Sequence, residues 1–200
     1  MRLDSKSVYR TVVLSSMVLI SPSTILFASK KMELSEENLK RIFEKNAEVS
    51  SDVEQTKYSQ FLFKPMVSKI KLRYSKDLIT WEYTEPFKKV ITINSNGVMK
   101  DLNSAANEAA EIQSNAGLKP VFNFIRSIFS LNFEELRKDF LIDISKDAIL
   151  AISRADSRVK FVKSMKFEFD SNLHPSRFVI DSDSEKMELV FRNFKIGNGK

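Results

Sequence analysis

The chain has 200 residues, of which 42% are hydrophobic and 29% charged, with no Cys and a formal net charge of +6. The absence of Cys excludes disulfides, thiol catalysis, a cysteine-lipidated N-terminus and thiolate metal sites. The length fits one domain, and the positive excess is modest and spread along the chain, so it does not predict nucleic-acid binding.

Residues 1–28 are predicted to be a secretory signal peptide. A positively charged segment comes first and contains Arg2, Lys6 and Arg10. An apolar run follows over residues 11–20 and resumes over 24–27, and Ala28 is the expected last residue before cleavage. The alternative is an uncleaved membrane anchor, but Pro22 and several serines interrupt the run, which falls short of the ~20 apolar residues that a spanning helix needs. The sequence therefore predicts an exported, soluble periplasmic protein with a single domain over residues 29–200.

The first element after the leader is predicted to be an amphipathic helix over residues 36–47. Ser35 is a good N-cap, because its hydroxyl can accept a backbone N–H of the first turn. Leu34 and Leu39 have the spacing of a hydrophobic staple. The apolar residues of the helix share one face, so this face needs an apolar partner.

After residue 50 the hydrophobic pattern alternates with a period of two, which predicts strands. The expected strands of this half are 53–63, 67–74, 78–84, 90–94 and 98–102. The strand 78–84 contains the only Trp of the chain, Trp81, and Pro86 marks its end because Pro cannot donate to a strand ladder. Asn96-Gly97, between the last two strands, is a strong hairpin signal.

A helical segment interrupts the strands. Residues 103–117 favour a helix because of their alanines. Residues 119–130 form a second amphipathic helix, and 133–138 add another helical turn. The apolar stripe of 119–130 must face the sheet that surrounds it.

The strands return in the second half of the chain. They are expected at 140–144, 148–154, 159–170, 177–181 and 186–196. Short turns between them predict an antiparallel meander. The fold class is therefore α+β, mainly β, with one antiparallel sheet curled around an apolar helix. The two apolar surfaces either meet as an ordinary core or enclose a cavity for a lipid, and the pattern alone favours the core.

The segments around Trp81 resemble the LolA-like family of periplasmic outer-membrane lipoprotein carriers. Tyr58-Ser59-Gln60 matches the family's aromatic-Ser/Thr-Gln pattern, and the run from Leu78 to Pro86 matches its Leu-x-x-Trp-x-x-x-x-Pro strand. The resemblance covers about residues 34–102, and the second half only by layout. It implies an incomplete, unclosed antiparallel β-barrel wrapped over a helical lid that encloses an apolar cavity.

The resemblance also implies a function: a periplasmic carrier, acting as a lipoprotein chaperone in outer-membrane biogenesis of a Gram-negative cell. It would be a monomer without enzymatic activity or cofactor. The cargo is an acylated lipoprotein or a related lipid, passed from an inner-membrane exporter to an outer-membrane acceptor. The residues expected to line its lipid cavity are Tyr58, Ile70, Leu72, Tyr74, Ile79, Trp81, Tyr83, Phe122, Ile125 and Phe129.

One family feature is missing from this chain. The family commonly carries an Arg shortly before the Trp strand, which helps to hold the lid closed. Ungapped counting places Ser75 at that position, and a turn one residue shorter places Lys76 there. Lys76 is therefore the candidate lid latch, and the chain is expected to be a divergent branch whose cargo includes other lipids as alternatives.

The sequence also bears on two other classes of function, an enzyme and a protein-docking module. An enzyme is not predicted, because the only His, His174, lies in an expected turn and no catalytic or phosphate-binding motif is present. The acids Asp181, Asp183 and Glu185 favour a solvated turn over a Ca²⁺ site, so no metal is expected. The alternative to a carrier is a protein-docking module of a lipid or envelope export system, without a lipid cavity, that uses the basic strand face of Lys69, Lys71 and Arg73.

Overall fold

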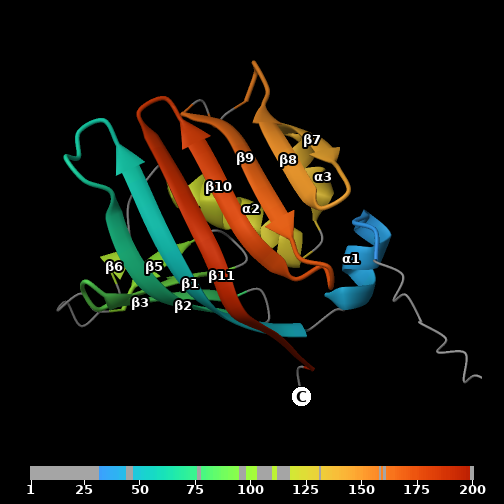
Figure 1. Cartoon of the computed structure of the whole chain (residues 1–200), viewed down its shortest axis with the longest axis horizontal. Coiled ribbons are helices and arrows are strands. Elements are labelled where there is room, and N and C mark those ends of the chain that lie inside the picture. The colour runs from blue at the N-terminus through green and yellow to red at the C-terminus, as the bar shows by residue number, and fades with distance from the viewer. Residues whose placement is uncertain are drawn as a thin grey trace, which may run out of the picture. The chain divides into compact units, whose positions relative to one another are not determined.

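The computed structural model describes most of the chain after the predicted leader (Figure 1). The described residues are 32–43, 47–75, 78–94, 98–102, 110–111, 118–130, 132–157, 159 and 161–198. All of them belong to one compact unit, Lys31–Lys200. The predicted signal peptide, Lys76 and the Asn96-Gly97 turn lie outside the described residues.

The described strands form one antiparallel sheet. In chain order they are β1 (Ala47–Ser59), β2 (Met66–Ser75), β3 (Leu78–Glu85), β4 (Lys89–Ile93), β5 (Met99–Asp101), β6 (Ala110–Glu111), β7 (Phe140–Ile144), β8 (Ala148–Ser153), β9 (Val162–Phe169), β10 (Pro175–Ser182) and β11 (Glu185–Asn198). Their order across the sheet is β6-β5-β4-β3-β2-β1-β11-β10-β9-β8-β7. Among the described strands β6 and β7 are the two edges, so the sheet is open, as the resemblance to the LolA-like family implies.

The first and last strands join the two halves of the sheet. β1 pairs with β11 along most of its length, with Val53 opposite Phe191 (Figure 1). The register shifts between Ser50 and Asp52, where Asn193 adopts a φ of 53° and donates from Nδ2 to Asp52 Oδ2 at 2.8 Å. Such a bulge bends the strand and increases its twist, which helps the sheet to curve.

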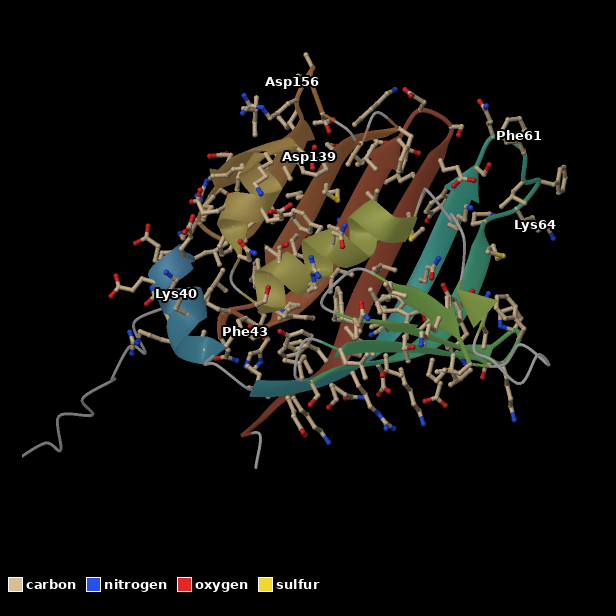
Figure 2. The ribbon with its side chains drawn as sticks, turned by 180° about the vertical axis from the view of Figure 1, so that it is seen from behind. Lys40, Phe43, Phe61, Lys64, Asp139 and Asp156 are labelled. Carbon is tan, nitrogen blue, oxygen red and sulfur yellow. The ribbon has the colours of Figure 1, made fainter. Side chains whose placement is uncertain are left out.

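The helix α2 (Leu118–Phe129) lies against the inner face of the sheet (Figure 2). Its side chains contact both halves of the sheet. The ring of Phe124 stacks on that of Phe178 of β10, with 5.1 Å between the ring centroids. The ring centroids of Phe129 and Tyr74 of β2 lie 5.5 Å apart. Phe124 and Ile125 are fully buried. The amphipathic stripe that predicted this helix is therefore the centre of the core.

The two shorter helices flank this core. α1 (Glu36–Ile42) begins at Ser35, whose Oγ accepts the backbone N–H of Asn38 at 3.1 Å, and Leu39 is buried. α3 (Phe133–Arg137) follows α2 as expected. The predicted end of the first helix at residue 47 is wrong, because Ala47 already pairs with Asn198 in β1.

The first strand was also expected too late in the chain. β1 begins at Ala47 rather than Val53, and it ends at Ser59 rather than continuing to Phe63. The backbone turns after Ser59, since the N–H of Leu62 donates to the Ser59 carbonyl at 3.0 Å. The apolar residues after this point form an exposed loop instead of a strand.

The alanine-rich segment 103–117 differs from the helix expected there, as far as it is described. Ala110 and Glu111 form β6 and pair with Asp101 and Lys100 of β5. Pairing with a neighbouring strand overrides the high helix propensity of alanine, because tertiary contacts outweigh intrinsic propensity. The rest of the segment lies outside the described residues. The alternation of β2 and β3, in contrast, is confirmed, with every second residue from Ser68 and from Ile79 buried.

Candidate functional site

A cavity of about 480 Å³ lies on the inner face of the sheet, at the end formed by the β1–β2 and β10–β11 hairpins. This volume is within the range of about 300–1,000 Å³ that is typical of small-molecule sites. Its lining residues are Gln55, Lys57, Met66, Tyr83, Phe87, Lys89, Ile91, Phe161, Val162, Ile180, Ser182, Glu185 and Met187. The walls therefore come from both halves of the chain.

Strand register builds the floor of the cavity. Lys57 of β1 lies opposite Met66 of β2 on one side and opposite Met187 of β11 on the other. Met187 in turn lies opposite Ile180 of β10. Directly opposed residues share a face of the sheet, so these four side chains form one row across four strands.

The next row of the sheet closes the cavity on the side of α2. Gln55 lies opposite Leu189, which lies opposite Phe178. Gln55, Leu189 and Phe178 are buried, and Phe124 of α2 stacks on Phe178. The cavity therefore ends where α2 begins to cover the sheet.

The mouth and the wall of the cavity differ in exposure. Met66 is 39% exposed and Phe87 is 47% exposed, so both reach solvent at the mouth. The Phe87 ring stacks on Tyr83 at 5.4 Å. Ile91, Val162 and Ile180 are buried and form an apolar wall. The site is thus a half-open apolar pocket.

Three polar contacts lie around the pocket. The Tyr83 hydroxyl donates to Gln55 Oε1 at 3.2 Å, and burial raises the pKa of Tyr83. Lys57 Nζ lies 2.9 Å from Glu185 Oε1. Ser182 Oγ donates to the Glu185 carbonyl at 2.7 Å. These groups can orient the polar end of an amphiphilic ligand.

The structure separates the predicted cavity residues into several groups. Tyr83 lines the cavity. Those buried in the core with α2 are Ile70, Leu72, Tyr74, Ile79, Trp81, Ile125 and Phe129. The two apolar stripes therefore do face each other, but in this structure they pack together. A lipid-contact role for these residues stays a prediction.

Two further residues of that set lie elsewhere. Tyr58 is 42% exposed, and it lies on the outer face because its neighbour Lys57 points inward and successive strand residues alternate. Phe122 lies within α2, but the structure does not describe its side chain. The candidate latch Lys76 lies outside the described residues.

Sequence reasoning missed most of the lining. Ile91, Ile180 and Met187 lie on strands that the pattern predicts, and the period of two places them on buried faces. What the pattern lacks is the register that brings β4 and β10 to the same cavity. Phe87 lies outside the predicted strands and gave no signal at all.

Of the candidates for catalysis and metal binding, Glu185 lines the cavity, whereas His174, Asp181 and Asp183 do not. His174 lies on the β9–β10 turn, with its ring 5.3 Å from that of Phe194. Asp183 pairs with Lys163 at 3.0 Å, and Glu185 pairs with Lys57. Across the described part of the chain, no group of three or more His, Cys, Asp or Glu could hold a metal ion. None of the described helices is long and apolar enough to cross a membrane.

No protein-family model and no curated protein matches this sequence. Among solved structures, the chain is similar to a LolA superfamily protein from Nitrosomonas europaea, with a TM-score of 0.43, 8% identity, and coverage of 80% of this chain and 90% of that one. It is also similar to the lipoprotein LppX of Mycobacterium tuberculosis, with a TM-score of 0.40, 13% identity, and coverage of 80% and 92%.

Proposed function

We propose that this protein is an exported carrier of a lipoprotein or a related lipid. It holds the acyl chains of its cargo in the cavity described above and transports them from the inner to the outer membrane. The observation that carries the proposal is the half-open pocket itself. Ile91, Val162 and Ile180 form its buried wall, and Met66 and Phe87 reach solvent at its mouth. This arrangement suits a hydrocarbon chain that enters from one end.

The physical chemistry of a carrier fits such a pocket. Each methylene removed from water contributes about 0.8 kcal/mol. A pocket that covered a whole acyl chain would hold it very tightly, whereas a carrier must also release its cargo. A volume of about 480 Å³ with an open mouth covers part of a cargo and leaves the rest accessible to an acceptor.

The polar rim supports an amphiphilic cargo rather than a plain hydrocarbon. Lys57, which lies opposite Met187, pairs with Glu185 at 2.9 Å, and both charged residues line the pocket. Ester, amide or carboxylate groups near the head of a lipid can hydrogen-bond to Lys57, while the tail contacts Ile180 and Ile91. No step of this function requires covalent chemistry.

The direction of transport rests on the sequence. The predicted signal peptide supports a periplasmic location of the mature protein, and the motif around Trp81 resembles that of the LolA-like carriers. An inner-membrane exporter as donor and an outer-membrane acceptor are the partners that this resemblance implies.

Binding of a fluorescent fatty acid tests the proposal. Met187→Trp places an indole in the cavity floor and should weaken binding at least tenfold. Lys186→Trp is the matched control, because it adds the same side chain to the neighbouring, outward-facing position of β11. It should bind like the wild type.

Two results would overturn the proposal. If the wild type shows no saturable uptake of the fatty acid, the carrier function is excluded. The protein-docking module is then the remaining function. Equal binding by Met187→Trp and Lys186→Trp shows that the fatty acid binds outside this cavity.

A further inference from the structure

The loop between β1 and β2 carries the two most exposed large apolar side chains of the described residues, Phe63 at 100% and Phe61 at 79%. Leu62, between them, is 43% exposed. Figure 2 shows Phe61 on this loop at the far end of the sheet from Phe43. Contiguous exposed apolar groups on a soluble protein mark an interaction site.

The exposed apolar surface continues onto the strand ends. Tyr58 and Val67 are exposed on the outer face, and Met66 is exposed on the inner face at the cavity mouth. The hairpin end, defined here as residues 58–67, is therefore apolar on both faces. A flat protein partner would cover one face of such a projection, whereas a lipid layer surrounds it on all sides.

Three backbone N–H donors of the turn are satisfied within the protein. The N–H of Leu62 donates to the Ser59 carbonyl at 3.0 Å, and that of Phe61 to Ser59 Oγ at 3.3 Å. The N–H of Gln60 donates to the Ser184 carbonyl at 3.3 Å. Unsatisfied polar groups are costly in an apolar medium, so these three bonds lower the cost of moving the turn out of water.

The charge around the hairpin end favours an anionic surface. Lys64 is exposed within the loop (Figure 2). The neighbouring acids are neutralised, because Glu185 pairs with Lys57 at 2.9 Å and Asp183 pairs with Lys163 at 3.0 Å. A cation beside apolar side chains suits the headgroup region of an anionic bilayer.

We propose that the hairpin end inserts into the surface of a lipid bilayer that contains anionic lipid. Phe61, Leu62 and Phe63 enter the apolar boundary, and Lys64 stays at the headgroups. Met66 belongs both to the hairpin end and to the cavity mouth, so insertion brings the mouth to the lipid. Vesicle binding itself does not require a ligand in the cavity, so this inference stands apart from the proposed carrier function.

Tryptophan fluorescence distinguishes a bilayer from a protein partner. In Phe63→Trp, vesicles of phosphatidylcholine and phosphatidylglycerol should shift the emission to the blue, and brominated lipid should quench it. Leu141→Trp is the control, because Leu141 is 56% exposed on β7, away from the hairpin end. It should show neither effect. Absence of both effects in Phe63→Trp overturns the proposal and leaves a protein partner for this surface.

Vesicle flotation measures how much the apolar side chains contribute to membrane partitioning. Phe61→Ser with Phe63→Ser should weaken partitioning about tenfold for each Phe removed. The matched control is Leu141→Ser with Ile152→Ser, an exposed apolar pair on β7 and β8. All variants are compared both as the full chain and as Lys31–Lys200, because the apolar run of the leader would itself bind vesicles. Equal loss in the two double variants overturns the proposal, and equal wild-type binding to pure phosphatidylcholine overturns the preference for anionic lipid.

Discussion

The hydroxyl of Tyr83 on β3 donates a hydrogen bond to Gln55 Oε1 on β1, at 3.2 Å, across the intervening strand β2. Both residues line the cavity, and both are buried. The bond therefore lies where the packed core under α2 changes into the open pocket. It satisfies two polar groups that the pocket would otherwise leave among apolar side chains.

Tyr83→Phe should lower the free energy of unfolding by about 1–3 kcal/mol, because it leaves the buried Gln55 oxygen without this donor. Denaturant unfolding measures the change. Tyr58→Phe removes the same hydroxyl from an exposed side chain and should have little effect. If Tyr83→Phe and Tyr58→Phe lower the free energy of unfolding equally, the hydrogen bond between Tyr83 and Gln55 does not stabilise the fold.

The contact between Phe124 and Phe178 should be one of the largest single contributions to stability. Phe124→Ala removes a fully buried ring that stacks at 5.1 Å and should cost about 3–5 kcal/mol, because a cavity remains under α2. The melting temperature and the denaturant midpoint should both fall.

Phe63→Ala is the control for this loss, since it makes the same change at a fully exposed side chain. We expect no measurable loss of stability from it. A large loss would mean that the hairpin end contributes to folding, which would contradict its role as an exposed insertion surface.

Asn193 is expected to maintain the bulge between β1 and β11. Its φ of 53° is unfavourable for most residues, and its side chain donates to Asp52 at 2.8 Å. Asn193→Ala should lower the free energy of unfolding by about 1–2 kcal/mol through backbone strain. Asn193→Gly, which tolerates this φ, should lose less. The reverse order in denaturant unfolding would contradict this explanation.

Glu188 should make stability depend on pH. Its hydrogen bond from Arg177 Nε, at 2.6 Å, holds the pKa of Glu188 below its ordinary value of 4.5. Because the folded-state pKa is the lower one, the contribution is present above about pH 4.5 and is lost as the pH falls through the folded pKa.

The measurement is the free energy of unfolding of Glu188→Gln relative to wild type, from neutral to acidic pH. The variant should be less stable at neutral pH, and the difference should disappear in acid. Glu33→Gln, at an exposed carboxylate near the start of the described chain, is the control and should show no such convergence. A difference that stays constant with pH would exclude the ion pair as its cause.

Local patterns in the sequence determined many of the elements. The period of two in β2 and β3 predicted which side chains are buried, because a strand half covered by a core must alternate. The stripe that contains Ile125 and Phe129 predicted α2 to within one residue at each end, because an amphipathic helix must bury one face. Ser35 marked the start of α1 through its cap.

Only the tertiary structure decided where the cavity lies. The row of Met66, Lys57, Met187 and Ile180 depends on pairing between β1 and β11. These are the first and last described strands along the chain, but they are neighbours in the sheet. Register between strands so far apart in the chain leaves no local trace, and a shift of one residue would exchange Lys57 for Tyr58 on the inner face. Burial patterns show which side chains avoid water, but the space left between them depends on how α2 and the curved sheet fit together.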